Sequence, residues 1–269
     1  MTKIVHLDAG HGGQDSGAVG NGLREKDIVL RLVKRVGSIL ENEYDGVNVK
    51  YTRTTDKFIS LSGRAKMANN EGADYFVSIH VNAGGGTGYE DFIWDGCPTN
   101  GKTDKARKKV HAAVVPVLKK YGITNRGMKK ANYAVLRETT MDAILVETLF
   151  IDRTSDANHL KDSNFLEDMA EAYAEGIADV LGVKRKKVTQ VSKPKPSKTK
   201  NLYLVQVGAF SRKSNADALV KKLKAKGFDA YVKDGGKLYR VQVGAYSKKS
   251  NANAMVNKLK KAGFNSFIK

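Results

Sequence analysis

The sequence predicts an α/β domain with a mostly parallel sheet flanked by helices, followed by a small β-α-β-β-α-β domain. Three observations support this prediction. Strand-like and helix-like patterns alternate through residues 1–182, a lysine- and proline-rich segment follows at 183–200, and residues 201–269 contain an internal repeat. Strands that alternate with helices are typical of α/β folds. We therefore expect two domains joined by a linker.

The elements of the first domain follow from the spacing of its apolar residues. Short apolar runs indicate buried strands, and apolar residues three or four positions apart indicate one face of a helix. The expected elements are strands at 3–10, 47–53, 73–82, 88–94, 133–137 and 143–151, and helices at 25–42, 60–71, 102–121 and 165–181. Pro116 lies inside one expected helix, so we expect a kink or a break there.

The segment at 184–200 shows no apolar period and is rich in lysine. It holds Pro194 and Pro196, two of the four prolines in the chain. A charged, proline-containing segment of this kind is extended because its like charges repel one another. We therefore place the boundaries at 1–182 for the first domain, 183–200 for the linker and 201–269 for the second domain.

The second domain is built from a repeat. Residues 202–233 align with residues 238–269 at an offset of 36, and 20 of the 32 aligned pairs are identical. Each copy shows a strand, a helix that begins at Ser-Asn, a glycine stop and a second strand. Two β-α-β halves form one ferredoxin-like unit with a four-stranded sheet and helices on one face.

Strand alternation assigns the side chains of this second sheet to two faces. The face expected to pack against the helices carries Val205, Val207, Val241 and Val243. The face expected to be open carries Leu204, Gln206, Arg240 and Gln242, with Tyr231 and Phe267 from the partner strands. Amide and aromatic side chains on a sheet suit a sugar chain, and a plain solvated face is the other interpretation.

The net charge of +19 is concentrated in one part of the chain. Residues 1–182 carry a net charge of −1, whereas residues 183–269 carry +20. Concentrated positive charge favours a polyanionic partner such as nucleic acid, an anionic membrane or an anionic wall polymer. We expect no membrane insertion, because no apolar stretch approaches the ~18 residues that span a bilayer.

Two histidines and a glutamate form a candidate metal site. His11 follows the carboxyl end of the first strand, His80 lies near the carboxyl end of the strand at 73–82, and Glu25 opens the first helix. Open parallel sheets bind ligands at this edge. A His-Glu-His set leaves the fourth tetrahedral position of zinc for a water whose pKa falls to about 7. Cys97, the one cysteine, excludes a cysteine-based site, and we expect it to be buried.

Glu147 interrupts an otherwise apolar strand at 143–151. A carboxylate there is costly unless it is paired or functional, so we assign it as general base and then general acid. Structural interpretations stay open at this point: the histidines can be packing residues, Glu25 can favour the helix N-terminus, and Glu147 can pair with a lysine. We expect His111 and His159 on the surface of helices.

Six stretches of the first domain resemble the zinc N-acetylmuramoyl-L-alanine amidases of the amidase-3 family. They are DAGHGG, GAVGNGLREKD, YTRTTD, LSGRAKMANN, ADYFVSIHVNAG and ILVETLFID, and the resemblance runs from Lys3 to about Leu181. The repeat at 201–269 resembles the sporulation-related repeat (SPOR) domain, which implies peptidoglycan binding. The combination is similar to the sporulation-lysis amidases of bacilli and to some phage endolysins.

The resemblance implies that His11, Glu25 and His80 bind one zinc ion and that Glu147 is catalytic. It implies hydrolysis of the amide between N-acetylmuramic acid and L-alanine in bacterial peptidoglycan. The sequence departs from the family pattern at two positions. Leu149 stands where the family commonly has glycine, and Asp152 stands where it has asparagine. These departures leave the ligands intact and alter the cleft beside Glu147. Asn82, two residues past His80, contacts substrate or braces its loop, and we favour bracing.

Three rival interpretations stay open. The first is a zinc peptidase that cuts within the stem peptide. The second is a nucleic-acid-binding protein, because RNA-recognition modules share the β-α-β-β-α-β topology, but the strand at 238–246 lacks their aromatic spacing and we expect no nucleic acid partner. The third is a wall-binding protein with an inactive enzyme domain, which the intact set of His11, Glu25, His80 and Glu147 disfavours.

The N-terminus, MTKIVHLDAGHGG, lacks the ~7–15-residue apolar core and small-residue cleavage site of a secretory signal. We therefore expect the chain to be made in the cytoplasm and to reach the wall by holin-mediated release or by cell lysis.

Overall fold

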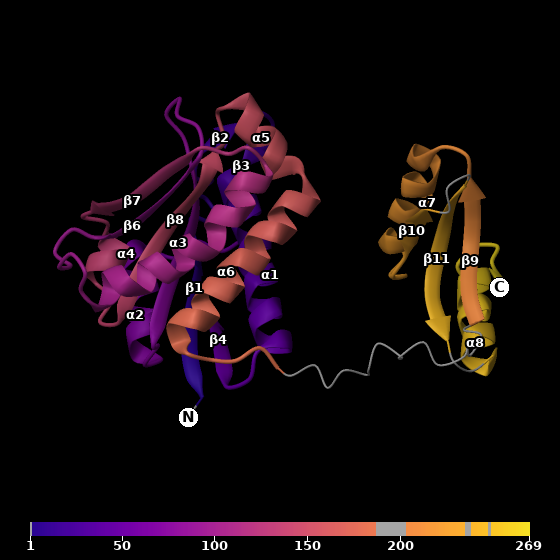
Figure 1. Ribbon diagram of the computed structural model, residues 1–269, viewed down its shortest axis with the longest axis horizontal. Helices are drawn as coiled ribbons and strands as arrows, with labels where there is room; N and C mark the ends of the chain where they lie inside the picture. The colour runs from indigo at the N-terminus through magenta and orange to yellow at the C-terminus, as the bar shows by residue number, and fades with distance from the viewer. Residues whose placement is uncertain (1, 187–202, 235–237, 247–248) are drawn as a thin grey trace. The chain divides into compact units, whose positions relative to one another are not determined.

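The computed structural model describes residues 2–186, 203–234, 238–246 and 249–269 (Figure 1). It contains two compact units, Met1–Val188 and Thr189–Lys269. Most of the expected linker at 183–200 lies outside the described residues, since the description stops at 186 and resumes at 203.

The first unit is built on a six-stranded sheet of order β4-β1-β5-β8-β6-β7. The strands are β1 (Lys3–Ala9), β4 (Val47–Tyr51), β5 (Tyr75–Asn82), β6 (Tyr89–Trp94), β7 (Asn125–Ala131) and β8 (Asp142–Phe150). All neighbouring strands are parallel except β6 and β8, which pair antiparallel. The predicted mostly parallel sheet is confirmed. A short hairpin, β2 (Val19–Gly20) and β3 (Leu23–Arg24), precedes the first helix.

Helices cover both faces of this sheet. One face packs against α1 (Glu25–Glu43), α3 (Lys102–Lys120) and α6 (Ser163–Leu181), whose apolar residues form the larger core; α6 runs beside α1 and α3 (Figure 1). The other face packs against α2 (Leu61–Asn70) and α4 (Ala134–Arg137), which bury a smaller cluster around Phe76 and Phe92. The remaining helix is α5 (Thr154–Lys161).

The structure corrects the expected strand at 133–137, which is the short helix α4. Val135 and Leu136 are adjacent, yet both are buried in the smaller cluster, which strand alternation does not allow. An apolar run this short does not distinguish helix from strand by its period. The prediction also missed β7 and α5, and α3 continues through Pro116 as one helix rather than breaking there.

Three single-residue expectations were also wrong. His111 is not on the surface but buried, with its Nδ1 2.5 Å from Asp91 Oδ2. His159 is half-buried, because its ring packs against the rings of Tyr121 and Phe165. Cys97 is half-buried rather than buried.

The second unit is a four-stranded antiparallel sheet of order β10-β11-β9-β12. Its strands are β9 (Tyr203–Phe210), β10 (Tyr231–Asp234), β11 (Tyr239–Tyr246) and β12 (Phe267–Ile268), and its helices are α7 (Lys213–Ala225) and α8 (Lys249–Lys261). Val205, Val241 and Val243 are buried against apolar residues of both helices. This chain order and strand order are those of the expected ferredoxin-like unit.

Candidate metal centre and pocket

The loop after β1 carries His11 to the carboxyl end of the sheet. His11 has a φ of 60°, and the neighbouring glycines make room for it. A Cβ atom on Gly10 would lie 2.3 Å from the His80 ring, so only glycine lets the two histidines approach. The His11 Nδ1 is 2.9 Å from Asp15 Oδ2, which leaves Nε2 to point at Glu25. A carboxylate on the second nitrogen is a common way to orient a metal-binding histidine.

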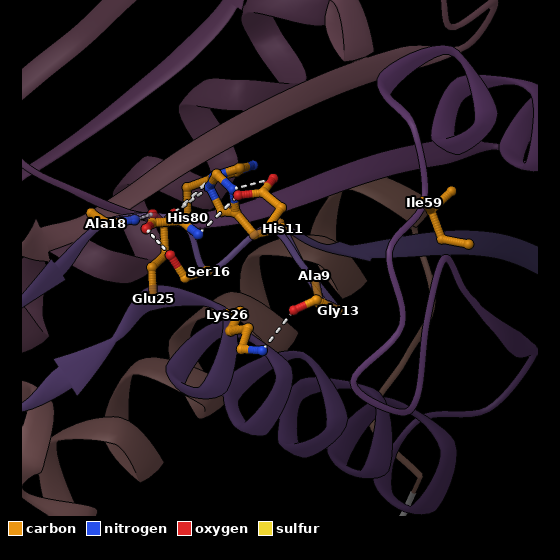
Figure 2. Close-up of polar contacts among 12 residues, drawn as sticks. Ala9, His11, Gly13, Ser16, Ala18, Glu25, Lys26, Ile59 and His80 are labelled. Atoms are coloured by element: carbon orange, nitrogen blue, oxygen red, sulfur yellow. Dashed lines mark hydrogen bonds and ion pairs between the residues drawn. The ribbon is translucent and has the colours of Figure 1, made fainter.

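Glu25 is the first residue of α1 and is buried. Its position follows from the β2–β3 hairpin, since its backbone N–H donates to the Ala18 carbonyl oxygen at 2.9 Å. Its Oε1 lies 3.1 Å from His11 Nε2 and 3.0 Å from His80 Nδ1, while its Oε2 accepts a hydrogen bond from the Ala18 N–H. Figure 2 shows the three side chains converging from three different elements.

These three side chains fit a metal ion. One ligand atom from each of His11, Glu25 and His80 lies within 4.8 Å of the others. Donors bound to a tetrahedral zinc at about 2.0–2.1 Å are roughly 3.3 Å apart. The distances from Glu25 Oε1 to the two histidine nitrogens, 3.1 and 3.0 Å, are close to this value. Burial raises the pKa of Glu25, but the hydrogen bonds from the two histidines outweigh it and hold the pKa well below its usual range. The carboxylate is therefore ionised and available as a ligand.

Glu147 lies beside this group, because it pairs in register with His80 across the parallel strands β8 and β5. Its Oε2 is buried without a hydrogen-bond partner, and the side chain forms no ion pair with any described residue. The alternative of a lysine partner is therefore not supported. Burial raises the pKa of Glu147 to about 7, with the Glu25 and Glu90 carboxylates adding to the rise and His80 opposing it.

A pocket of about 320 Å³ opens over these residues. Its lining combines His11, Glu25, His80 and Glu147 with the half-exposed Tyr133 and the apolar Val135 and Leu145. A second hollow of about 370 Å³ shares the two histidines and extends past Phe58 and Ile59. The candidate metal centre thus lies where two hollows meet, so an elongated substrate can cross it. Tyr133 was not predicted to line the pocket, because residues 133–137 were expected to form a strand.

The strand β8 is irregular immediately after Glu147. The pairing of β5 and β8 shifts register between His80 and Asn82, and Leu149 takes a φ of 69° while fully buried. A left-handed backbone costs a residue with a side chain roughly 1–2 kcal/mol, which explains why glycine suits this position. Here the buried leucine side chain offsets part of that cost.

The other departure from the family pattern has a structural role. The Asp152 carboxylate accepts hydrogen bonds from the N–H groups of Gly84 and Gly85, both at 2.8 Å, and so holds the loop after β5. Asn82 lines the pocket and also braces its surroundings, since its Nδ2 donates to Glu90 Oε1 at 2.8 Å.

Three buried cationic side chains hold the loop that carries His11. Arg64 pairs with Asp8 at 2.8 Å and donates to the His11 carbonyl oxygen. Arg53 donates to three backbone carbonyl oxygens around the loop, and the Lys26 ammonium donates to the Gly13 carbonyl oxygen (Figure 2). The Arg53 side chain is long enough to come from a distant segment, so no local pattern signals its role.

In the second unit, the structure places four predicted residues in one row across the sheet. Tyr231 pairs with Gln242, Gln242 with Gln206, and Gln206 with Phe267. The two rings are 45% and 54% exposed, whereas both glutamines are buried, so the expectation of two open amides was wrong. The Tyr231 hydroxyl donates to Gln242 Oε1 at 3.1 Å. The row therefore presents two exposed rings above a buried amide floor.

The comparisons with known proteins agree with this geometry. A family model described as N-acetylmuramoyl-L-alanine amidase (Amidase_3) matches residues 5–179, and a SPOR domain model matches residues 199–269. The chain is 43% identical over 234 residues to the sporulation-specific N-acetylmuramoyl-L-alanine amidase of Bacillus subtilis, covering 86% of this chain and 84% of that protein.

Two further relatives are a phage protein and a solved structure. The chain is 48% identical over 205 residues to the endolysin of Bacillus phage SPP1, covering 74% of this chain and 75% of that protein. The catalytic domain of CwlV from Bacillus (Paenibacillus) polymyxa var. colistinus superposes with a TM-score of 0.63 at 35% identity, covering 68% of this chain and all of that one. The chain therefore belongs to the amidase-3 family of N-acetylmuramoyl-L-alanine amidases and carries a C-terminal SPOR domain.

Proposed function

We propose that this chain is a zinc-dependent amidase that hydrolyses the bond between N-acetylmuramic acid and L-alanine in bacterial peptidoglycan. The observation that carries the proposal is the convergence of His11, Glu25 and His80 beside Glu147 in one pocket. A zinc ion held by these three residues would supply a polarised carbonyl and an activated water. Membership of the amidase-3 family supports this reaction over cleavage within the stem peptide.

Glu147 moves the protons in this proposal. Its carboxylate accepts a proton from the attacking water and returns it to the leaving L-alanine nitrogen. In the metal-free chain burial raises the pKa of Glu147 to about 7, so its protein surroundings favour holding a proton. The unpartnered Oε2 is available for this contact, since no described side chain competes for it.

The test is to treat the zinc-loaded full chain with a chelator and to identify the new amine terminus released from sacculi. We expect loss of activity on chelation, recovery with zinc, and L-alanine as the only new amino terminus. A new terminus inside the stem peptide would instead favour the peptidase, and activity that survives complete metal removal would contradict the metal assignment.

The second unit holds the enzyme on its substrate in this proposal. The SPOR family match supports peptidoglycan as the binding target, and the row of Tyr231, Gln242, Gln206 and Phe267 is the proposed contact. Exposed aromatic rings provide large contact area at low entropic cost, which suits a sugar chain lying across the sheet. The buried amides fix the floor between the two rings.

The helices of this unit add a second kind of contact, with anionic wall polymers. Eight lysines are exposed there: Lys213, Lys221, Lys222 and Lys224 on α7, and Lys249, Lys258, Lys260 and Lys261 on α8. Among the described residues of the unit, one ion pair forms, between Lys213 and Asp217. Walls that retain phosphate-containing polymers should therefore bind more tightly at low salt than stripped walls, and equal binding to both would contradict this contact.

No helix in the described part of the chain is long and apolar enough to cross a membrane. The relatives include an endolysin and a sporulation-specific amidase. Both names fit our proposal that the chain acts on the wall after holin-mediated release or after lysis of the producing cell. Loss of lysis in a strain that lacks the holin would identify the first route.

A further inference from the structure

Glu90 on β6 is a second buried carboxylate on the pocket side of the sheet. It is the Cα partner of Glu147 across the antiparallel pair of β6 and β8, so the two side chains share a face. Asn82, which lines the pocket, donates to Glu90 Oε1 at 2.8 Å. Glu90 therefore connects the pocket to the outer strand β7.

Two cations from β7 meet this one carboxylate. Arg126 Nε lies 2.6 Å and Lys129 Nζ 2.5 Å from Glu90 Oε2. The two side chains remain 34% and 38% exposed, and neither pairs with another described carboxylate. One buried negative charge thus faces two half-exposed positive charges, which leaves a surplus positive charge on β7, joined to the pocket residue Asn82 through Glu90.

Aromatic rings hold both cationic groups in place. The Arg126 guanidinium lies 4.9 Å from the centre of the Phe150 ring, and the Lys129 ammonium lies 5.8 Å from the centre of the Phe92 ring. Contacts of this kind orient a cation without neutralising it. The pair is therefore preorganised to receive an anion, and a planar guanidinium suits a carboxylate.

We propose that Arg126 and Lys129 bind the carboxylate of the second stem-peptide residue, which makes them specificity residues of the amidase. The inference rests on the proposed function. Strand β7 is two strands from β8, or roughly 10 Å from Glu147 at about 4.8 Å per strand. An extended peptide advances about 3.3–3.6 Å per residue, so a carboxylate on the second residue from the cleaved amide reaches the pair.

The experiment compares two soluble muramoyl peptides that differ only in the second residue, with a free carboxylate in one and a carboxamide in the other. For the zinc-loaded full chain we expect roughly tenfold or greater preference for the carboxylate in kcat/KM, mostly through KM, because a charge-assisted contact is lost in the amide. Arg126→Gln and Lys129→Gln should each bring the ratio towards one. Lys130→Gln is the matched control, since Lys130 contacts the Cys97 carbonyl oxygen instead, and it should keep the preference.

Binding of both compounds to the Glu147→Gln variant separates this inference from hydrolysis. Tighter binding of the carboxylate, abolished by Arg126→Gln, supports the inference even if the wild-type chain cleaves neither compound, a result that would reject only the proposed function. Equal binding and equal cleavage of the two compounds overturn the inference and leave the amidase proposal standing. A variant that weakens both compounds equally also overturns it, because Arg126 would then only support Glu90.

Discussion

The two units of this chain bury polar groups in opposite arrangements. The first unit gathers four ionisable side chains at one end of its sheet, where Glu147 lies in a pocket with an unpartnered oxygen. The second unit spreads its candidate contacts over four strands, with Gln206 and Gln242 covered and two rings exposed. A change of one atom at the concentrated site should abolish catalysis, whereas the loss of one residue from the distributed surface should weaken wall binding only in part.

The largest effect should come from Glu147→Gln, which removes the proton acceptor at the concentrated site. We expect a loss of roughly 10²–10⁴-fold in kcat, with zinc content and wall binding unchanged. Release of amino termini from sacculi measures the first quantity, and metal analysis and co-sedimentation measure the others. If this variant kept substantial activity, Glu147 would not be the base.

Leu149→Gly tests how far the stability of the first unit depends on the left-handed residue that lies two positions past Glu147 in β8. Glycine adopts the left-handed φ without strain, which stabilises the fold, but the change also removes a fully buried side chain, which destabilises it. The loss of the buried side chain is the larger effect. We expect the free energy of unfolding to fall by about 2–4 kcal/mol in urea titrations. An unchanged or increased stability would show that strain dominates at this position.

Glu147 makes the stability of the first unit depend on pH. The folded pKa of Glu147 is raised to about 7 from 4.5, so its stabilising neutral form is fully present below pH 4.5 and is lost as pH rises through 7. In the metal-free chain at pH 8, Glu147→Gln should therefore stabilise the fold by about 1–3 kcal/mol. Thermal unfolding at pH 4 and pH 8 measures this, and an equal effect at both values would contradict it.

The smallest effect should come from the distributed surface. Tyr231→Ala or Phe267→Ala in the Glu147→Gln chain should each weaken sedimentation with sacculi by about tenfold or less, because the other ring remains. The double variant should lose more than either single variant. Asn257→Ala, an exposed and uncharged change on α8, is the control and should have little effect. Complete loss of binding in one single variant would show that this surface is as concentrated as the pocket.

Much of the fold followed from apolar periodicity, since the long helices and buried strands of both units lie within a few residues of their predicted ranges. The exceptions share a physical cause. Strand β7 is a polar edge strand with no buried residue, so its sequence carries no burial period. Helix α4 is a single turn, too short to show a helical period.

The convergence of His11, Glu25 and His80 was predictable because each residue follows directly from where a strand ends or a helix begins. Some of the residues that support this group were not predictable. Arg53 reaches the His11 loop through a long side chain from a segment far along the chain, and Glu90 joins the site only through the pairing of β6 with β8. The order of the strands, and which side chains meet across neighbouring strands, are properties of the folded sheet. Local sequence patterns do not encode them.

The offset of 36 residues relates Gln206 to Gln242 and Tyr231 to Phe267, so the row in the second unit is nearly its own image after a half-turn. Only the tyrosine hydroxyl distinguishes one end from the other. A directional polymer that lies across such a row meets almost the same groups whichever end leads. If this row is the wall contact that we propose, the unit should bind a glycan strand equally well in either polarity.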